Sequence, residues 1–278
     1  MVEGDEYNDI YPVWNWRKLP GVTCYQSPEP VKPLNIRGYR NGSNFSGGIT
    51  NGKDGITALH LIRDSLTARK AWFFFDDLMV CLGAGINTPL HSEVSTTLNQ
   101  CHLKGNVSYW DGKEISIDQG DAKSPGSVKW IYHNKIGYYI LQSSSIEISA
   151  LSQEGDWHEI ASLYKPEKVS SKVFTLSINH GFKPDNDSYA YAILPAVSKD
   201  ELKAFVPGFQ IIKNDPSCQV IADKDMSRIM MVIYEPVQLQ ITGAINFRCD
   251  QAGIYLFEKK GSGWNVYLSD PTHKLNAV

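Results

Sequence analysis

Short runs of alternating apolar and polar residues, separated by turn residues, dominate this chain of 278 residues. Such runs are typical of strands in antiparallel sheets, where every second side chain faces the core. In Ser188–Pro195 the alternation puts Tyr189 and Tyr191 on one face. The pattern predicts strands at Ile56–Ile62, Lys70–Phe75, Met79–Leu82, Val94–Leu98, Ser127–His133, Gly137–Leu141, Ile146–Leu151, Val173–His180, Ser188–Pro195, Gln219–Asp223, Ile229–Ile233, Val237–Thr242, Gly253–Glu258 and Gly263–Ser269.

Turn signals close several of these runs, notably Asp111-Gly112 and Asn134-Lys135. Many short strands at regular spacing predict an all-β fold, a sandwich of large antiparallel sheets. One short helix is predicted at residues 198–205, where Ser198 and Glu201 have the spacing of a capping box. The chain has no linker, internal repeat or low-complexity tract, which favours a single domain over residues 1–278.

The most informative segment is Lys70–Asn87, with the sequence KAWFFFDDLMVCLGAGIN. It predicts two buried strands around a turn at Asp76-Asp77, closed by a break at Gly83-Ala84-Gly85. Three of its aromatic side chains are expected to pack between sheets. A solvated hairpin tip explains the two aspartates better than a metal site or an acid pair does.

Composition narrows the function classes. A net charge of −3 gives no bulk attraction for polyanions, so nucleic acid is not an expected partner. Five cysteines without a CxxC motif indicate neither a zinc site nor a disulfide scaffold. No apolar run approaches the roughly 18 residues of a membrane span, so no membrane association is predicted. The acidic start of the chain does not have the pattern of a signal peptide.

Motifs that carry chemistry are sparse. His60 lies in an apolar stretch and His180 ends a strand, so both are interpreted as structural histidines rather than catalytic ones. Asp185-Asn186-Asp187 resembles part of a calcium loop but lacks the glycine and the distant glutamate that such a loop needs. No Gly-X-Ser-X-Gly nucleophile elbow occurs. The residues therefore predict no metal and no cofactor.

Four collinear segments carry a resemblance to a known family. They are Tyr7–Thr23, Gly42–Gly48, Lys70–Asn87 with Thr96–Gln100 following it, and Ile178–Gly181 with Tyr189–Pro195. Together they resemble polysaccharide lyase family eight, the chondroitin AC and hyaluronate lyases. The resemblance implies a helical α/α-toroid, then a central β super-sandwich of the galactose-mutarotase and hyaluronate-lyase type, then a small β domain. Residues 1–278 are expected to be the central domain alone, without the other two.

The resemblance also implies a reaction, the β-elimination of chondroitin sulfate or hyaluronan. Its Asn, His, Tyr and Arg are expected on the toroid, and its supporting Glu just before the Tyr7 segment, all outside this chain. No catalytic residue is therefore assigned, and the isolated chain is expected to be inactive. Because enzymes of this family are exported by bacteria, an extracellular or periplasmic location is expected. The missing signal peptide then indicates either a truncated chain or a fragment of a longer precursor.

The first loop holds the main candidates for substrate binding: Trp14, Asn15, Trp16 and Arg17, followed by Lys18. Sugar rings stack on Trp, amides bind hydroxyls, and Arg binds carboxylate or sulfate as a fork. Alternatively, the two tryptophans pack into the core, while the Asn alternates to the opposite face. The resemblance places a substrate-contacting Asn near this loop in hyaluronate lyases and an acidic residue there in chondroitin AC lyases.

A second group of candidates is Tyr39, Arg40 and Asn44 in the stretch 37–44. The resemblance places a sugar-stacking aromatic nearby, with Tyr39 as its nearest match. Arg37 and Arg40 either meet sulfate or carboxylate groups or are ordinary exposed arginines.

Three readings of function remain open from the sequence. The chain is one wall of a lyase cleft that binds a glycosaminoglycan beside its own α/α-toroid, a stand-alone carbohydrate-binding module, or a purely structural scaffold. The sequence does not distinguish chondroitin from hyaluronan.

Overall fold

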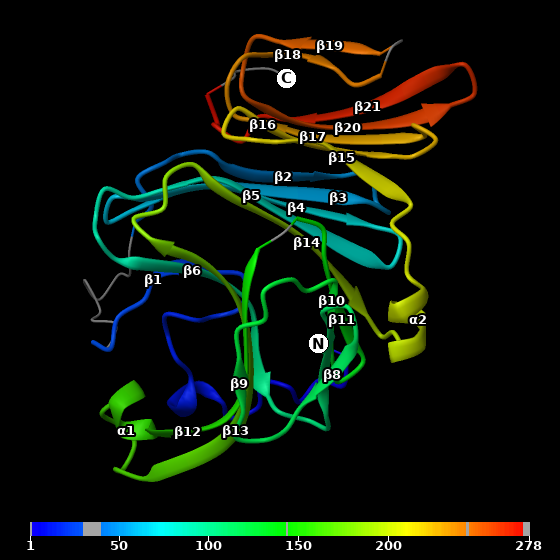
Figure 1. Cartoon of the computed structure of the whole chain (residues 1–278). Helices are drawn as coiled ribbons and strands as arrows, with labels where there is room; N and C mark the ends of the chain where they lie inside the picture. Colours follow the sequence, from blue (N-terminus) through cyan, green and yellow to red (C-terminus); the bar gives the residue numbers. More distant parts are fainter. Residues whose placement is uncertain (1, 30–39, 143, 243–244, 275–278) are drawn as a thin grey trace. The chain divides into compact units, whose positions relative to one another are not determined.

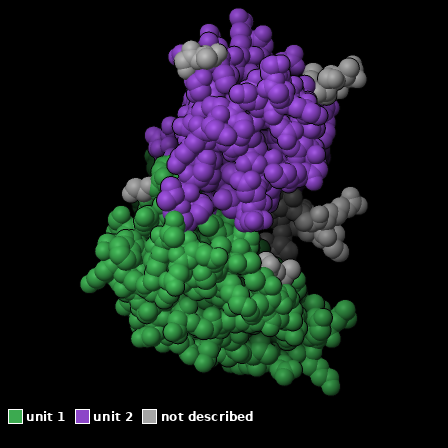
Figure 2. All heavy atoms as spheres, turned by 90° about the vertical axis from the view of Figure 1, so that its right-hand side faces the viewer, with its two compact units in different colours: residues 1–38, 90–184, 193–204 green, residues 39–89, 185–192, 205–278 purple. Residues whose placement is uncertain are grey.

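The structure is a computed structural model that describes residues 2–29, 40–142, 144–242 and 245–274. Its regular secondary structure is almost entirely antiparallel strand, which confirms the predicted all-β class (Figure 1). The chain forms two compact units, coloured separately in Figure 2. Unit 1 comprises residues 1–38, 90–184 and 193–204, and unit 2 comprises residues 39–89, 185–192 and 205–278.

Unit 1 has at its centre a sheet with the strand order β1-β6-β13-β12-β9. Its strands are β1 (Thr23–Tyr25), β6 (Glu93–His102), β9 (Ala122–Lys123), β12 (Ser145–Asp156) and β13 (Lys168–Phe182). Strands β12 and β13 form a long hairpin, with Ile146 opposite Ile178 and Ile148 opposite Leu176. These four side chains are buried and form part of the core of the unit.

A second set of strands in unit 1 has the order β11-β10-β7-β8. Its members are β7 (Val107–Trp110), β8 (Glu114–Ile117), β10 (Trp130–His133) and β11 (Ile136–Ile140). It packs on the first sheet through Phe174, whose ring stacks on His133 at 4.3 Å between centroids and lies 6.2 Å from the ring of Tyr138.

The short helices of unit 1 are η1 (Tyr11–Val13), α1 (Trp157–Ile160) and α2 (Lys199–Ala204). Helix α2 confirms the predicted capping box, because Ser198 N donates to Glu201 Oε2 at 2.7 Å and Glu201 N donates to Ser198 Oγ at 3.2 Å. Helix α1 was not predicted. Its N-cap is Asp156, whose side chain accepts from His158 N, a local signal that is easily missed in a polar loop.

Unit 2 contains two sheets and a two-stranded ribbon, visible as layers in Figure 1. One sheet contributes neighbouring strands in the order β2-β3-β4-β5-β14. They are β2 (Ser46–Thr50), β3 (Gly55–Arg63), β4 (Leu66–Phe75), β5 (Leu78–Asn87) and the first part of β14 (Asp187–Pro195). The other, in the order β15-β16-β17-β20-β21, is formed by β15 (Phe209–Asn214), β16 (Cys218–Asp223), β17 (Arg228–Ile233), β20 (Gly253–Lys260) and β21 (Gly263–Ser269). The ribbon is formed by β18 (Val237–Gln240) and β19 (Asn246–Cys249).

The segment Lys70–Asn87 forms the hairpin β4–β5, and the predicted turn at Asp76-Asp77 is confirmed. The predicted break at Gly83 is wrong, because β5 runs on to Asn87. Gly83 is needed for packing instead: a Cβ there would lie 2.1 Å from Cε1 of Tyr189. The packing of three aromatics is also corrected, since Phe73 and Phe75 are buried but Phe74 is 41 % exposed.

Candidate functional site

The sheet β1-β6-β13-β12-β9 of unit 1 has one unusually polar face, which is partly buried. Ladder partners on this face are polar on both sides, as in Glu147 opposite Ser177 and Asn179 opposite Ser95. We call this set the polar face; its members are Glu93, Ser95, Thr97, Gln100, Glu147, Thr175, Ser177 and Asn179. The hydroxyls of Ser95, Thr97 and Thr175 are buried without a hydrogen-bond partner in the described part of the chain. The polar face therefore keeps unused hydrogen-bonding capacity.

The N-terminal loop is tied to the polar face by Gln100, whose side chain is fully buried. Gln100 Oε1 accepts from Asn15 N at 2.8 Å, and its Nε2 donates to the carbonyls of Asn15 at 3.0 Å and Lys18 at 2.7 Å. The indole of Trp14 donates to the Gln100 carbonyl at 3.2 Å. One buried amide thus fixes the main chain of the predicted binding loop.

The two tryptophans of this loop have different environments. Trp14 packs against the buried cluster of Ile10, Val13 and Val173, as the structural alternative proposed. Trp16 is 41 % exposed. Its ring lies 5.7 Å from that of Trp14 and 6.3 Å from that of Tyr11, which is 48 % exposed. We call Tyr11, Trp14 and Trp16 the aromatic platform, with the half-buried Trp14 as its support.

Hydrogen bonds to the protein itself occupy part of the polar side-chain groups that were predicted to bind substrate. Asn15 is exposed, and its Oδ1 accepts from Arg17 N at 3.0 Å. The guanidinium of Arg17 donates to the Glu29 carbonyl at 3.1 and 3.2 Å, so part of its donor capacity holds the loop. Lys18 Nζ lies 3.1 Å from Glu147 Oε2. The structure therefore gathers Asn15, Trp16 and Lys18 beside the polar face.

The second predicted group is not brought into this site by the described contacts. Tyr39 lies outside the described residues, as does Arg37. Arg40 is exposed in unit 2, and Asn44 Nδ2 donates to the Thr272 carbonyl at 3.2 Å in the same unit. That bond gives Asn44 a structural role.

A network of charged and amide groups crosses the polar face. It was not predicted from the sequence. Asn179 Nδ2 donates to Glu93 Oε1 at 2.5 Å and to Glu147 Oε1 at 2.8 Å, and Ser177 Oγ donates to Glu147 Oε2 at 3.2 Å. Burial raises the pKa of Glu147, but the hydrogen bond from Asn179 and the charge of Lys18 outweigh it and leave the pKa lowered. Glu147 is thus a charged acceptor at neutral pH. Asn179 belongs to the segment Ile178–Gly181, in which only His180 was considered for a functional role from the sequence.

Three histidines, His60, His133 and His180, have structural environments. His180 Nε2 lies 2.8 Å from Thr96 Oγ1 in the core, which confirms the interpretation of His180. Burial and the neighbouring Arg69 guanidinium lower the pKa of His60 to about 4, and burial lowers the pKa of His133 to about 4. A general base works best with a pKa near the operating pH, so neither of these two histidines is suited to that role.

The acidic residue directly before the Tyr7 segment, Glu6, is buried. Its carboxylate accepts from Glu3 N at 2.8 Å and Gly4 N at 2.9 Å, and also from Val2 N. Burial opposes ionisation, but these main-chain donors prevail and lower the pKa of Glu6 to about 2. Glu6 therefore shapes the start of the N-terminal segment.

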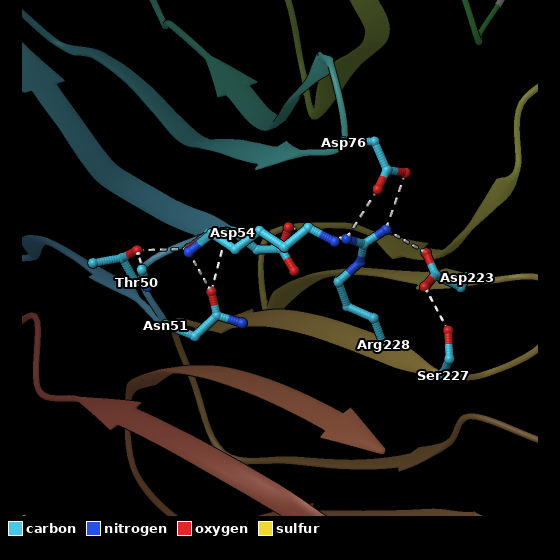
Figure 3. A network of polar contacts seen from close by, with 9 residues as sticks. Thr50, Asn51, Asp54, Asp76, Asp223, Ser227 and Arg228 are labelled. Carbon is cyan, nitrogen blue, oxygen red and sulfur yellow. Dashed lines mark hydrogen bonds and ion pairs between the residues drawn. The ribbon is translucent and has the colours of Figure 1, made fainter. Parts of the chain in front are cut away.

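Unit 2 contains an ion-pair network around Arg228, shown in Figure 3. The guanidinium lies 3.0 Å from both Asp54 and Asp223 and 3.2 Å from Asp76, and it covers the ring of Phe75 at 4.6 Å. These partners raise the pKa of Arg228 despite its burial. A cavity of about 600 Å³ lies beside the network. Since the guanidinium is matched by carboxylates, we interpret this network as a structural clasp between hairpin ends.

Comparisons with known proteins divide the chain into two parts. Residues 1–206 match the model of the super-sandwich domain of polysaccharide lyase family 8. Residues 210–278 match the model of the C-terminal β-sandwich domain of that family. The sequence predicted one central domain over all 278 residues, without the small C-terminal domain, whereas the matches include both domains.

Curated relatives of the chain are lyases. It is 35 % identical over 280 residues to chondroitinase-AC of Pedobacter heparinus, a match that covers 99 % of this chain and 39 % of that protein. It is 28 % identical over 181 residues to a xanthan lyase of Bacillus sp., with 59 % of this chain and 19 % of the relative covered. The chain thus spans about two fifths or less of the length of these relatives.

Solved structures with a similar fold are also those of lyases. A chondroitinase AC lyase studied in complexes with oligosaccharides has a TM-score of 0.91 at 33 % identity, over 98 % of this chain and 40 % of that one. A xanthan lyase of Paenibacillus has a TM-score of 0.85 at 22 % identity, over 96 % of this chain and 27 % of that one, which shows a shared fold.

Proposed function

The chain belongs to polysaccharide lyase family 8, and we propose that it is the β part of an exported bacterial enzyme that cleaves chondroitin sulfate or hyaluronan by β-elimination. In this proposal it binds the polymer and forms one wall of the cleft. The α/α-toroid of the same enzyme supplies the groups that neutralise the uronate carboxylate and move the C5 proton.

One observation carries the binding role: the exposed ring of Trp16 stands beside a polar face with charged and amide groups already fixed in place. Trp16 and Tyr11 offer ring faces to the C–H faces of a sugar. Glu147 and Asn179 offer fixed acceptors and donors for hydroxyl groups. Because Gln100 already fixes the main chain of the loop, little conformational entropy remains to be lost on binding.

The assignment of catalysis to another domain is supported by the state of three of the seven histidines, His60, His133 and His180. The pKa values of His60 and His133 lie far below neutrality, and His180 is bonded to Thr96 in the core. The chain alone is therefore expected to bind glycosaminoglycan without turning it over.

Two measurements on the 278-residue chain test this proposal. Calorimetric titration with chondroitin and hyaluronan oligosaccharides is expected to give saturable binding. The ultraviolet absorbance of the unsaturated product, followed after mixing the chain with either polymer, is expected to stay flat. Robust turnover would place the catalytic groups on this chain and contradict the assignment of catalysis to the α/α-toroid.

A second candidate is a carbohydrate-binding module that works without a toroid, favoured by the exposure of Tyr11 and Trp16. It predicts the same affinity for the chain and for a full-length enzyme that contains it. The cleft-wall proposal predicts tighter binding by the full-length enzyme.

A further inference from the structure

Phe182 at the end of β13 is 60 % exposed, yet its ring is not isolated. The imidazole of His91 stacks on it, with 5.2 Å between ring centroids and 25° between ring planes. His91 is itself exposed and follows β5, on the connection that leads into β6. Two chain segments thus build one exposed aromatic stack of Phe182 and His91, which we call the second platform.

The local backbone holds the second platform in a fixed orientation. The pairing of β13 with β6 shifts register between Asn179 and Phe182, and Gly181 has a φ of +72°. Asn179 Oδ1 accepts from Gly181 N at 2.7 Å, and the Ser92 carbonyl accepts from Lys183 N at 3.2 Å. Such bulges bend a strand and re-aim its side chains, so the exposure of Phe182 is built into the strand.

The bulge also places the second platform at the end of the charged network. Phe182 is the ladder partner of Glu93, which accepts from Asn179 at 2.5 Å. Asn179 reaches Glu147 at 2.8 Å, and Glu147 meets Lys18 of the N-terminal loop at 3.1 Å. A continuous line of polar contacts therefore runs from the loop that carries Trp16 to Glu93, the ladder partner of Phe182, all of it in unit 1.

We propose that Phe182 and His91 form a further saccharide subsite, which extends the binding track of the N-terminal loop along a polymer. This rests on the proposed function. Because of the bulge, Ser177 and Phe182 lie opposite Thr97 and Glu93, four residues apart on β6. The sheet advances about 13 Å over this stretch at about 3.3 Å per residue, so the track suits a chain of several sugars rather than a disaccharide. The ring of Phe182 stacks on a sugar face, while Glu93 and Asn179 bind its hydroxyls.

The charges near this subsite define the kind of sugar unit that it takes. Glu93 and Glu147 are acceptors and repel sulfate or carboxylate groups, whereas they bind hydroxyl donors. The subsite therefore takes an unsulfated hexosamine face. A 4-sulfated or 6-sulfated unit is expected to bind there less tightly.

The test compares oligosaccharide lengths by calorimetry, with hyaluronan tetrasaccharide and decasaccharide as probes of the 278-residue chain. The decasaccharide is expected to bind at least fivefold more tightly than the tetrasaccharide. Phe182→Ala is expected to remove this gain and leave the tetrasaccharide unchanged, while Phe182→Tyr keeps it. Phe74→Ala, which truncates an exposed ring of unit 2, is the matched control and is expected to change neither affinity.

The outcomes separate the two proposals. Trp16→Ala is expected to weaken both oligosaccharides, which Phe182→Ala does not. If Phe182→Ala weakens both lengths equally, or weakens neither, the subsite of Phe182 and His91 is overturned. The proposed role of the aromatic platform is then unaffected. If the wild-type chain binds neither probe, both proposals fall. Unchanged thermal unfolding of each variant excludes misfolding as the cause of a loss.

Discussion

The side-chain amide of Gln100 forms a two-way clamp with the main chain of Asn15, accepting from its N–H at 2.8 Å and donating to its carbonyl at 3.0 Å. Gln100 belongs to the central sheet, whereas Asn15 belongs to the loop that carries the exposed Trp16. This contact therefore couples the rigid part of unit 1 to the part that is proposed to meet the polymer.

Replacement of this amide is expected to loosen the loop. In Gln100→Ala three main-chain groups lose their partner, which costs about 2–3 kcal/mol of the free energy of unfolding. Urea denaturation measures the loss, and hydrogen exchange at residues 15–18 is expected to speed up. Gln119→Ala is the control, because that side chain is exposed in a turn. A variant with unchanged exchange in the loop would show that other contacts hold it.

Removal of the guanidinium at the centre of Figure 3 is expected to destabilise unit 2. Arg228→Met leaves the buried carboxylate of Asp54 without its cation, at a cost of about 3 kcal/mol. Arg248→Met removes a pair that is about three quarters exposed, and is expected to cost less than about 0.5 kcal/mol. Denaturation curves of the two variants compare these costs directly. Equal losses would mean that the clasp contributes no more than a surface pair.

The pKa of Glu6 predicts an acid-sensitive start of the chain. The folded-state pKa of about 2 lies below the ordinary value of 4.5, so the stabilisation is present above about pH 4.5 and is lost as the pH falls toward 2. Glu6→Gln is expected to lower stability by about 1–2 kcal/mol at pH 7 and to make little difference at pH 2. Thermal unfolding of both proteins across this pH range tests the sign. A constant difference at all pH values would show that the charge plays no part.

Most strands could be predicted from the sequence, because apolar alternation is local and survives without knowledge of partners. The sequence prediction missed short edge strands such as β1 and β9, which have too few residues to show a period. Gly83 was predicted to end a strand, because its packing role depends on Tyr189, which lies more than a hundred residues away in the sequence. A glycine that makes room for a ring looks the same in sequence as one that ends a strand.

The site was predictable only in part, because contacts between residues far apart in the sequence leave no local signal. Trp16 and Asn15 were found because the loop itself is rich in sugar-binding residue types. Glu147 and Asn179 were missed, because they meet only through the pairing of β12 with β13. Trp14 and Arg17 have the right chemistry, but Trp14 supports the core and Arg17 contacts main-chain carbonyls.

The central claim is that the aromatic platform binds glycosaminoglycan, and one paired titration tests it most directly. The wild-type chain, Trp16→Ala and Trp264→Ala are titrated with hyaluronan and chondroitin oligosaccharides. Trp264 has similar exposure but lies in unit 2, so it is the matched control. Trp16→Ala is expected to weaken binding fivefold to thirtyfold, about 1–2 kcal/mol, with Trp264→Ala unchanged. Equal affinity of wild type and Trp16→Ala, or no binding by the wild-type chain, would contradict the account.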